Sequence, residues 1–514
     1  MGTEIELKLL VAAKDLPRLR DVLATLAAAG RPRRQRLLSH YFDTPTLQVR
    51  DKGAALRVRK IGGRWVQTLK AGGGVSAAMH QRGEWETLVN KPFPDLGRLA
   101  AAFPGEKTLA RFLKKLPASH AIQRVFSTDF HRDIFDFTLP DGSQVEAAVD
   151  EGEVRLGKTG TLIAELELEL KSGDPLTVLE LARRVLIEVP LRIGVVTKAQ
   201  RGYSLLEGGN VSPPRHAADL ALRPALPVDE VFARIFAECF DHLLDNTEAV
   251  IEQRDPEYLH QMRVAIRRLR AGLAVFGDVV PRVVFAGLAH ALQQEGQALG
   301  EARNWDVLRH ETLPACAAAM KTSMSPALEE QLRKHAQRAA AQARQLVASR
   351  TFTDIALRTA IFISGHRWRV AAGESAAAAL AEPIGVFARR TIVTRHKQLK
   401  KRVALALPGQ AESLHAARIA AKKLRYTLEF FASLFPEKAV RNHLRHLADL
   451  QDILGTINDA ATAIDLLARM VEPSPHLLPE VAQWEAALTA RSRRGQAQFA
   501  KAWARFAERP VMPE

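Results

Sequence analysis

The 514-residue sequence predicts an α+β protein with two folded parts. The first is an eight-stranded antiparallel β-barrel with flanking helices, and the second is an all-α domain of two helical bundles related by a pseudo-twofold axis. Charged and apolar residues alternate in short segments of the first two hundred positions, and this period of two is typical of β-strands. Beyond residue 224 the apolar period becomes 3.6, which indicates helices, and a repeat with an offset of 155 residues runs through this part.

The composition is that of a water-soluble globular protein, with 47% hydrophobic and 25% charged residues. A chain of this length requires more than one hydrophobic core. The two cysteines, Cys239 and Cys316, are too far apart in sequence to suggest a disulfide framework or a cysteine zinc site. Because no signal peptide opens the sequence and no apolar run could span a bilayer, we expect a cytoplasmic protein that does not bind membranes.

The net charge of +16 predicts a polyanionic partner. Residues 251–450 hold 31 basic and 17 acidic residues, a local excess of 14 positive charges. Nucleic acid, acidic membrane and polyphosphate would all be attracted to such a segment. An aromatic content of 6% leaves few stacking platforms for single-stranded nucleic acid, and no groove-reading motif occurs, so we expect no specific nucleic-acid partner.

The first predicted strand, residues 3–10, carries a row of charges on one face. Glu4, Glu6 and Lys8 alternate with apolar residues, so neighbours in this row lie about 7 Å apart. Two carboxylates followed by an ammonium could hold a divalent metal next to a phosphate. An amphipathic strand with solvated charges explains this strand, taken alone, equally well.

The remaining elements follow in order from their apolar periods and the turn residues between them. The predicted strands cover 40–44, 55–60, 65–70, 82–86, 122–130, 134–139, 144–149 and 162–170. The predicted helices cover 15–28, 95–116 (as two helices) and 175–187, and residues 194–202 close the domain. About eight antiparallel strands with charges of both signs on one face fit a closed barrel whose polar interior can hold a ligand.

Residues 152–159 match the phosphate-binding loop pattern G-x-x-x-x-G-K-[S/T]. Such a loop must open a helix whose N-terminus binds the phosphates. Residues 161–170 instead alternate as a strand does. The sequence therefore predicts a β-hairpin around residues 157–160 in place of a phosphate-binding loop.

Glycines and prolines mark a boundary between the two parts. We expect a barrel domain at 1–207, a linker at 208–224 and a helical domain at 225–514. In the helical domain, residues 231–305 recur as residues 386–460 without a gap. The repeat predicts two similar bundles.

Each copy of the repeat places a row of cations on one helix face. Like charges stacked at these spacings cost a few tenths of a kcal/mol per pair. A row that occurs twice despite this cost favours a bound polyanion, whereas two solvated helix faces are the simpler alternative. The rows are His260, Arg263, Arg267 and Arg270 in the first copy, and His415, Arg418, Lys422 and Arg425 in the second.

The ordered motifs of residues 1–205 resemble the CYTH domain of the triphosphate tunnel metalloenzymes. They are Glu4-x-Glu6-x-Lys8, Tyr41-Phe42-Asp43-Thr44, Leu56-Arg57-x-Arg59, Thr68-Leu69-Lys70, Arg82-x-Glu84-x-Glu86, Glu165-x-Glu167-x-Glu169 and Lys198-x-x-Arg201-Gly202. The resemblance implies an eight-stranded tunnel that binds triphosphate with Mg²⁺ or Mn²⁺.

The same resemblance implies roles for individual residues. The metal ligands would be Glu4, Glu6, Glu165, Glu167 and Glu169. The substrate-binding wall would consist of Lys8, Arg57, Arg59, Lys70, Arg124, Arg132, Lys198 and Arg201, although the pattern around Arg124 and Arg132 is looser. The catalytic residues would be Lys8, Glu6 and Glu169.

Residues 225–510 resemble the CHAD domain, through H-x-x-R-x-x-x-[RK]-x-x-R and L-G-x-x-[RN]-[ND] in both copies. The resemblance implies a helical module that binds inorganic polyphosphate through its two basic rows. A histidine metal site fits less well, because His260 and His415 lie among cations.

Together the two resemblances predict a metal-dependent inorganic triphosphatase with a polyphosphate-binding module, found in the cytoplasm and associated with polyphosphate granules. Bacterial CYTH–CHAD inorganic triphosphatases are the implied relatives. The alternatives are a tunnel enzyme acting on thiamine triphosphate or ATP, and a non-catalytic protein that binds polyphosphate and targets granules.

Overall fold

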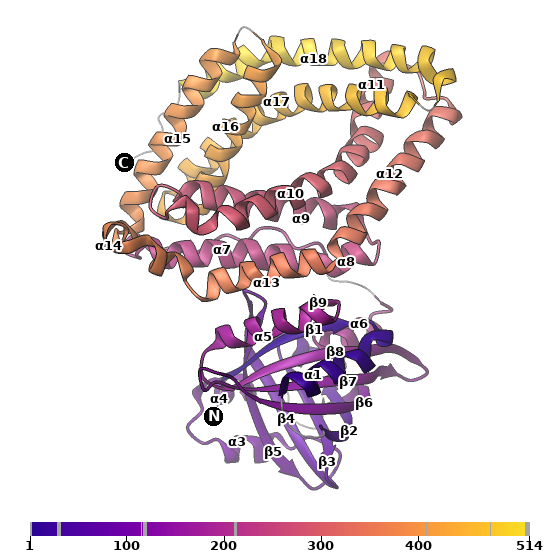
Figure 1. Cartoon of the computed structure of the whole chain (residues 1–514), viewed down its shortest axis with the longest axis vertical. Coiled ribbons are helices and arrows are strands. Elements are labelled where there is room, and N and C mark those ends of the chain that lie inside the picture. Colours follow the sequence, from indigo (N-terminus) through magenta and orange to yellow (C-terminus); the bar gives the residue numbers. More distant parts are fainter. Residues whose placement is uncertain are drawn as a thin grey trace. The chain divides into compact units, whose positions relative to one another are not determined.

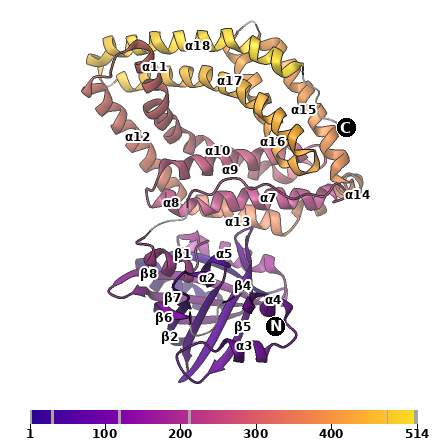
Figure 2. The ribbon, with the colours of Figure 1, turned by 180° about the vertical axis from the view of Figure 1, so that it is seen from behind.

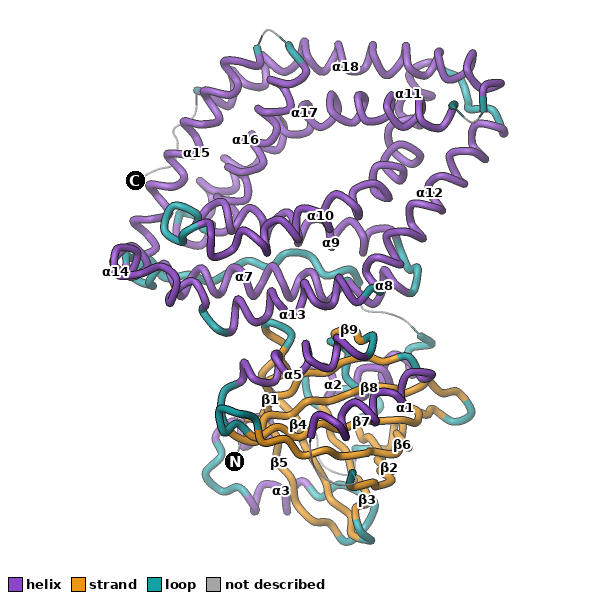
Figure 3. The backbone as a smooth tube through the Cα atoms, in the orientation of Figure 1, coloured by secondary structure: helices purple, strands orange, loops and turns teal. Residues whose placement is uncertain are grey.

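A computed structural model of the chain describes residues 3–27, 32–114, 116, 121–209, 213–407, 409–472 and 474–508. It divides into two compact units, Met1–Pro213 with Ala348–Gly365, and Pro214–Val347 with His366–Glu514. All strands of the described residues lie in the first unit, and the second unit consists of helices and their connections (Figure 3). The predicted α+β class is therefore confirmed.

The strands of the first unit form the predicted eight-stranded antiparallel barrel (Figure 1). Their order is β5-β4-β3-β2-β6-β7-β8-β1, and β1 pairs with β5 to close the barrel. The ninth strand pairs with β1 only at Leu9–Val11, beyond the part that pairs with β5. The strands are β1 (Thr3–Val11), β2 (Arg33–Asp43), β3 (Ala55–Ile61), β4 (Arg64–Ser76), β5 (Met79–Val89), β6 (Gln123–Thr138), β7 (Gln144–Leu156), β8 (Thr159–Ser172) and β9 (Leu191–Ile193).

Two local features of the strands bear on the sequence predictions. The strands expected at 122–130 and 134–139 are one continuous strand, β6, because residues 131–133 pair with both β2 and β7. The hairpin expected around 157–160 is confirmed: β7 ends at Leu156, β8 begins at Thr159, and Gly157 turns with a φ of +60°.

The first unit has one hydrophobic cluster outside the barrel wall and a second inside one part of it. In the outer cluster, Leu56, Val58 and Trp85 are fully buried and pack with the two helices that follow β5. In the inner cluster, Tyr41 and Phe126 pack with Tyr203 of the helix at residues 198–206. The charged part of the interior remains available for a polar ligand.

A helix from far along the chain completes the first unit. Helix α13 packs against α5 and β9, where Arg183 Nε donates to Asp354 Oδ1 at 2.8 Å and Arg350 Nη1 donates to the Ile187 carbonyl at 2.6 Å. The helices of this unit are η1 (Ala13–Asp15), α1 (Leu16–Ala27), α2 (Gln48–Asp51), α3 (Leu96–Ala102), α4 (Lys107–Leu113), α5 (Pro175–Glu188), α6 (Lys198–Leu206) and α13 (Arg350–Ser364). The predicted helix ends at residues 28 and 115 lie outside the described residues.

The second unit contains long helices in two similar sets, which Figure 2 shows from behind. The first set is α7 (Val228–Asp245), α8 (Thr247–Ile251), α9 (Pro256–Phe276), α10 (Arg282–Val307), η3 (Leu308–Thr312), α11 (Leu313–Met320) and α12 (Pro326–Val347). The second set is α14 (Arg367–Ala381), α15 (Ile384–Ala406), α16 (Ala411–Phe430), η4 (Ala432–Leu434), α17 (Glu437–Val471), η5 (Pro475–Leu477) and α18 (Leu478–Ala507). No helix in the described part of the chain is long and apolar enough to cross a membrane.

The helix boundaries follow the sequence repeat. Helices α16 and α17 begin 155 residues after α9 and α10, the offset at which the sequences align. Helix α9 packs against α7, α10 and α16, and α16 packs against α15 and α17. The duplicated helices α9 and α16 are therefore in direct contact within this unit.

The segment expected to be a linker, 208–224, is held against the second unit over its latter part; residues 210–212 lie outside the described residues. Asn246 Nδ2 donates to the Arg215 carbonyl at 3.0 Å, and the Ala218 amide donates to Glu238 Oε1 at 2.7 Å. The Leu222 amide donates to Ser433 Oγ at 3.0 Å. Residues 214–224 of the expected linker thus belong to the helical unit, whereas residues 208–209 belong to the first unit.

Candidate active site

The barrel encloses a cavity of about 320 Å³ whose walls are almost entirely charged. The inward positions alternate along each strand, as the period of two requires. The lining residues are Glu4, Glu6, Lys8, Tyr41, Ala55, Arg57, Arg59, Lys70, His80, Arg82, Glu84, Glu86, Arg132, Glu146, Ala148, Glu167, Glu169, Lys171, Thr197, Lys198 and Ala199.

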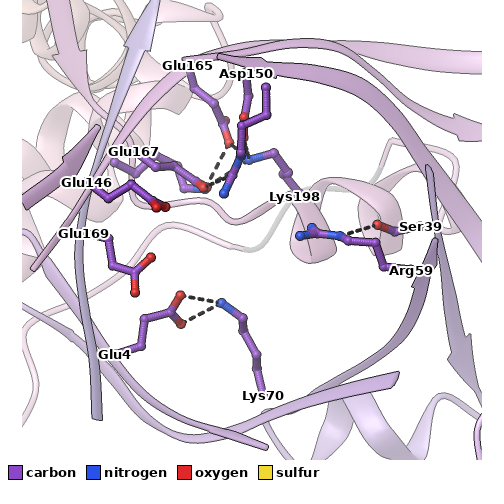
Figure 4. Close-up of polar contacts among 12 residues, drawn as sticks. Glu4, Ser39, Arg59, Lys70, Glu146, Asp150, Glu165, Glu167, Glu169 and Lys198 are labelled. Carbon is purple, nitrogen blue, oxygen red and sulfur yellow. Dashed lines mark hydrogen bonds and ion pairs between the residues drawn. The ribbon is translucent and has the colours of Figure 1, made fainter. Parts of the chain in front are cut away.

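Strand register brings three carboxylates together at one part of this cavity. Glu165 of β8 lies opposite Asp150 of β7, and Glu167 lies opposite Lys8 of β1. Carboxylate oxygens of Asp150, Glu165 and Glu167 lie within 4.8 Å of one another. We call these three residues the deep carboxylates; Figure 4 shows them grouped around Lys198.

Cations neutralise the deep carboxylates. Lys8 Nζ lies 3.1 Å from Glu165 Oε1 and 2.7 Å from Glu167 Oε1. Lys198 Nζ lies 2.6 Å from Asp150 Oδ2 and also pairs with the two glutamates. Arg132 forms a two-pronged contact with Asp150, with both distances 2.7 Å. Arginine favours this fork geometry on a carboxylate.

Helix α6 delivers Lys198 into the cavity. The Thr197 side chain caps the helix together with Gln200, so Lys198 occupies the first helical position. Gly202 allows α6 to approach the wall, because a Cβ at this position would lie 2.1 Å from the Phe126 ring. Arg201 of the same helix lies 3.0 Å from Glu165 Oε2. The motif Lys198-x-x-Arg201-Gly202 thus closes one side of the cavity with two cations.

Burial favours the neutral forms of Lys8 and Glu165, whereas ion pairing favours their charged forms. Ion pairing has the larger effect on both pKa values. Burial alone would lower the pKa of Lys8, but Glu165, Glu167 and Glu6 outweigh it and hold that pKa above its usual range. Burial would raise the pKa of Glu165, but Lys198 and Lys8 lower it to about 2. These groups are therefore fully ionised at neutral pH.

A second group of carboxylates lies farther along β1, β7 and β8. Glu6 of β1 is opposite Glu169 of β8, and Glu169 is opposite Glu146 of β7. Burial raises the pKa of Glu169, and the charges of Glu4 and Glu146 raise it further, whereas Lys171 opposes the shift. We call Glu4, Glu6, Glu146 and Glu169 the outer carboxylates; Figure 4 shows Glu4, Glu146 and Glu169 facing the cavity.

Both carboxylate groups offer hard oxygen ligands of the kind that Mg²⁺ and Mn²⁺ bind. The oxygens of the deep carboxylates are already shared among Lys8, Lys198 and Arg132. Among the outer carboxylates, Glu4 pairs with Lys70 at 2.6 Å and Glu169 with Lys171 at 2.7 Å, whereas Glu6 forms no ion pair among the described residues. The oxygens of Glu6 are therefore available to a divalent cation beside Glu4 and Glu169, so the outer carboxylates fit a metal better.

The opposite wall of the cavity is cationic. Arg59 of β3 is buried, and its Nε donates to Ser39 Oγ at 2.9 Å, as Figure 4 shows. Burial, together with the charges of Arg57 and Arg132, lowers the pKa of Arg59 to about 9. Arg59 forms no ion pair among the described residues, whereas Arg57 lies 3.3 Å from Glu84. A buried guanidinium without a carboxylate partner is suited to bind an anion that enters the cavity.

The structure brings most of the residues predicted from sequence to this cavity, but not all. Glu165 and Arg201 contact it through the deep carboxylate group. Arg124 is exposed on β6, does not line the cavity, and acts on His40 instead. The loose motif around Arg124 placed the residue on the strand but did not fix the face on which it lies.

Sequence reasoning missed several residues that line the cavity or lie next to it. Asp150 of the deep carboxylates continues the alternation of Glu146 and Ala148 on β7, but the predicted strand ended at residue 149. His80 precedes the strand predicted at 82–86, and the motif Arg82-x-Glu84-x-Glu86 was given no role, although all four residues line the cavity. The period of two extended by one step would have found Asp150.

The Tyr41-Phe42-Asp43-Thr44 motif supports the cavity wall, and Tyr41 itself lines the cavity. Asp43 is fully buried and accepts hydrogen bonds from the amides of Thr44, Val49 and Arg50 and from the Tyr203 hydroxyl. It therefore ties β2 to α2 and α6. Tyr41 stacks on Phe126 at 4.6 Å.

In the helical unit, the middle parts of the two basic rows lie close together. Arg263 lies against α10, where its Nη1 donates to the Leu299 carbonyl at 3.2 Å. The same nitrogen lies so close to Gly300 that a Cβ at this position would be 3.2 Å from it. Burial, together with the charges of Arg267, Arg303 and Arg418, lowers the pKa of Arg263 to about 10. We call Arg263, Arg267, Arg418 and Lys422 the paired rows.

The outer members of the predicted rows differ from this centre. Arg425 pairs with Glu429 at 2.7 Å and donates to Gln451. His415 Nδ1 lies 3.2 Å from Asn458 Oδ1, and both it and Arg270 are exposed. His260 is half-buried, and burial together with Arg303 lowers its pKa.

Comparison with known proteins agrees with the division of the chain. Residues 2–203 match the CYTH domain family, and residues 234–468 match the CHAD domain family. An inorganic triphosphatase of Haemophilus influenzae is 30% identical over 208 residues, which are 40% of this chain and 55% of that protein. The chain thus spans about half the length of this curated relative.

Among solved structures, the CHAD domain of the plant Ricinus communis resembles the helical part. It is 32% identical, covers 59% of this chain and 99% of its own length, and gives a TM-score of 0.51. This similarity supports an all-helical fold for the second part of the chain.

Proposed function

The chain belongs to the CYTH and CHAD families, with a CYTH domain followed by a CHAD domain, and on this premise we propose that its barrel hydrolyses inorganic triphosphate to diphosphate and phosphate. The observation that carries this proposal is a charged cavity in which Arg59, a buried cation without a carboxylate partner among the described residues, lies across from the outer carboxylates. A triphosphatase is also the activity named for the 30% identical relative.

The cationic wall would bind the triphosphate. Arg59 has no carboxylate partner among the described residues, so its positive charge is not neutralised before a phosphate binds. Arg57, Arg132 and Lys198 already pair with carboxylates and would share their donors with the substrate. Fixed cations around a polyanion stabilise the charge that moves onto the leaving diphosphate. Because the cations are held in place before the substrate enters, little reorganisation is required during the reaction.

The outer carboxylates would hold a divalent cation, for which we propose Mg²⁺ or Mn²⁺. Glu4, Glu6 and Glu169 would be its ligands, with Glu146 next to them. When bound, the ion would polarise the terminal phosphoryl group for attack by water. Lys8, anchored between Glu165 and Glu167, would remain charged and keep the terminal phosphate oriented.

For the helical domain, residues 225–514, we propose binding of long-chain inorganic polyphosphate. The paired rows collect cations of α9 and α16 in one place, and their mutual repulsion lowers the pKa of Arg263 and Arg418 after burial. A polyanion that lies across both helices would relieve this repulsion. Such binding would also bring the protein to polyphosphate granules in the cytoplasm.

A phosphate-release assay tests the catalytic proposal. We expect hydrolysis of tripolyphosphate to exceed that of thiamine triphosphate, ATP and long polyphosphate, because the cavity walls carry charge rather than an aromatic pocket. Glu6→Ala should reduce turnover a hundredfold or more, about 2.7 kcal/mol. Glu151→Ala is the matched control, because Glu151 is an exposed β7 carboxylate that pairs with Arg20. Equal turnover of the Glu6 variant and wild type at saturating Mg²⁺ would refute the assignment.

A further inference from the structure

A second group of cations gathers where four helices of the helical unit meet. Arg395 Nη2 of α15 donates to the Ala274 carbonyl at 2.5 Å and so ties α15 to the last turn of α9. Cations from the other three helices lie close enough to Lys423 of α16 to lower its pKa. We call the group the flank cluster; it consists of Arg270 (α9), Arg282 (α10), Arg395 and Arg402 (α15) and Lys423 (α16).

The flank cluster has almost no negative charge of its own. Within the described residues, none of its five members forms an ion pair with a carboxylate, and Arg270 contacts only the neutral amide of Gln293, at 3.3 Å. Asp278 is the one acid that acts on Arg395. After burial, Arg395, Arg402, Arg282 and Arg270 are the largest influences on the pKa of Lys423, and all four lower it. Surfaces usually mix the two signs, so this group is unusual.

The sequence repeat shows that no equivalent cluster exists at the repeat-related positions. The counterpart of Lys423 in the other copy is Arg268, which is buried and pairs with Glu429 at 3.0 Å. The counterpart of Arg282 is an acid, Glu437, and that of Arg395 is Phe240. At the equivalent place of the other repeat the charges are thus neutralised or absent. Duplication of a charged helix face cannot by itself explain the flank cluster.

The flank cluster begins where the paired rows end. Lys423 follows Lys422 directly on α16, and Arg270 lies about one turn, or roughly 5 Å, beyond Arg267 on α9. We propose that the flank cluster is a second phosphate-binding site, which takes the phosphates of a polyphosphate chain that leaves the paired rows at this one end. This inference rests on the proposed binding of polyphosphate by the helical domain.

The chemistry of the site suits successive phosphates of a flexible polymer. Arg270, Arg282, Arg402 and Lys423 are exposed and can follow the chain, whereas Arg395 is fixed by its bond to α9. Each phosphate that displaces condensed counterions adds to the salt dependence of binding. A short chain that fills only the paired rows would gain nothing from the cluster, so its contribution must depend on chain length.

The test is a titration of the full-length protein with short and long inorganic polyphosphate and with duplex DNA, in EDTA so that hydrolysis is prevented. The test variant is Arg402→Glu with Lys423→Glu. The matched control is Lys397→Glu with Lys401→Glu, which changes the charge equally at exposed positions of α15 about 200–240° away from Arg395 around the helix. The variant Arg263→Glu with Arg267→Glu reports on the paired rows.

We expect the test variant to bind long polyphosphate about tenfold more weakly and its salt slope to fall by about 1.5, with short-chain binding and the control unchanged. Equal effects in test and control variants, or loss of short-chain binding, would overturn the flank site. A greater loss for DNA than for polyphosphate would also overturn it, by assigning the cluster to nucleic acid. If wild type binds no polyphosphate, the proposed function itself fails; if only the paired-row variant loses binding, the flank site alone fails.

Discussion

Lys422 on α16 is a cation whose charge depends on what binds next to it. Burial, together with the charges of Arg418, Arg267 and Arg263, lowers its pKa to about 7, although Asp459 opposes the shift. Near neutral pH a large fraction of the free protein therefore holds Lys422 as a neutral amine. A polyanion on the paired rows would favour the ammonium and return the pKa towards its usual value.

Polyphosphate binding should then take up a proton. Because the complex binds more protons than the free protein above pH 7, we expect affinity to fall as the pH rises from about 7 towards 10 and to level off below pH 6. Calorimetry in buffers of different ionisation enthalpy measures the uptake. Lys422→Arg should abolish most of the uptake while preserving binding, because arginine stays charged. An uptake that persists in this variant would contradict the role of Lys422.

At the residue scale, alternation predicted well which residues share the cavity and poorly where a strand stops. Glu4, Glu6 and Lys8 line one wall because β-strand geometry forces residues two apart to the same face. Asp150 was missed because the strand was ended one residue early. The placement of Arg59 without a carboxylate partner depends on strands far apart in sequence, so no local pattern could show it.

Among the elements, the hairpin between β7 and β8 shows how context overrides a motif. Its sequence matches the pattern of a phosphate-binding loop. However, Leu156 pairs with Thr159 across the turn, and the turn leads directly into strand β8. Lys158 sits in the exposed turn and does not line the cavity.

We therefore expect Lys158→Ala to leave turnover and triphosphate affinity within about twofold of wild type, whereas removal of a phosphate-binding lysine should cost far more. Steady-state phosphate release measures both, and Lys198→Ala serves as the positive control because Lys198 lies inside the cavity. A hundredfold loss in the Lys158 variant, about 2.7 kcal/mol, would restore the loop as a functional site.

Helix α13 is the element whose place could not be predicted. Its buried residues occupy nearly every position from Phe352 to Ile363, so the helix has more than one buried face, and its sequence does not show which element covers each face. In the structure it packs on α5 and β9 of the barrel unit, although it lies between the two helical repeats in sequence. The partner of such a helix is set by tertiary packing rather than by local periodicity.

A break in α13 should consequently weaken the barrel. We expect Ala356→Pro, at a buried position in the middle of α13, to cost about 3 kcal/mol. The temperature at which triphosphatase activity is lost should fall. Gln342→Pro breaks α12, an exposed helix position of the other unit, and should leave that temperature unchanged. Equal inactivation temperatures for the Ala356 variant and wild type would show that α13 does not stabilise the barrel.

For the whole molecule, the change of period from two to 3.6 was sufficient to predict a barrel followed by helices, because the two periods bury different faces. The barrel closure also followed, since charges of both signs on one strand face require a polar interior. The contact between α9 and α16 did not follow from the sequence. Two equal repeats can pack through several faces, and only the packed helices show that Arg267 and Lys422 meet.

The division into two units, each with its own buried residues and charge cluster, predicts that the two proposed activities can be removed separately. Arg263→Glu with Arg267→Glu should abolish polyphosphate binding and leave kcat/KM for tripolyphosphate within about twofold, since substitutions at independent sites act additively. Glu6→Ala should do the reverse. Phosphate release and polyphosphate titration of both full-length variants make the comparison. Loss of triphosphatase activity in the charge-reversed variant would mean that the helical unit supports catalysis, and the two sites would then have to be treated as coupled.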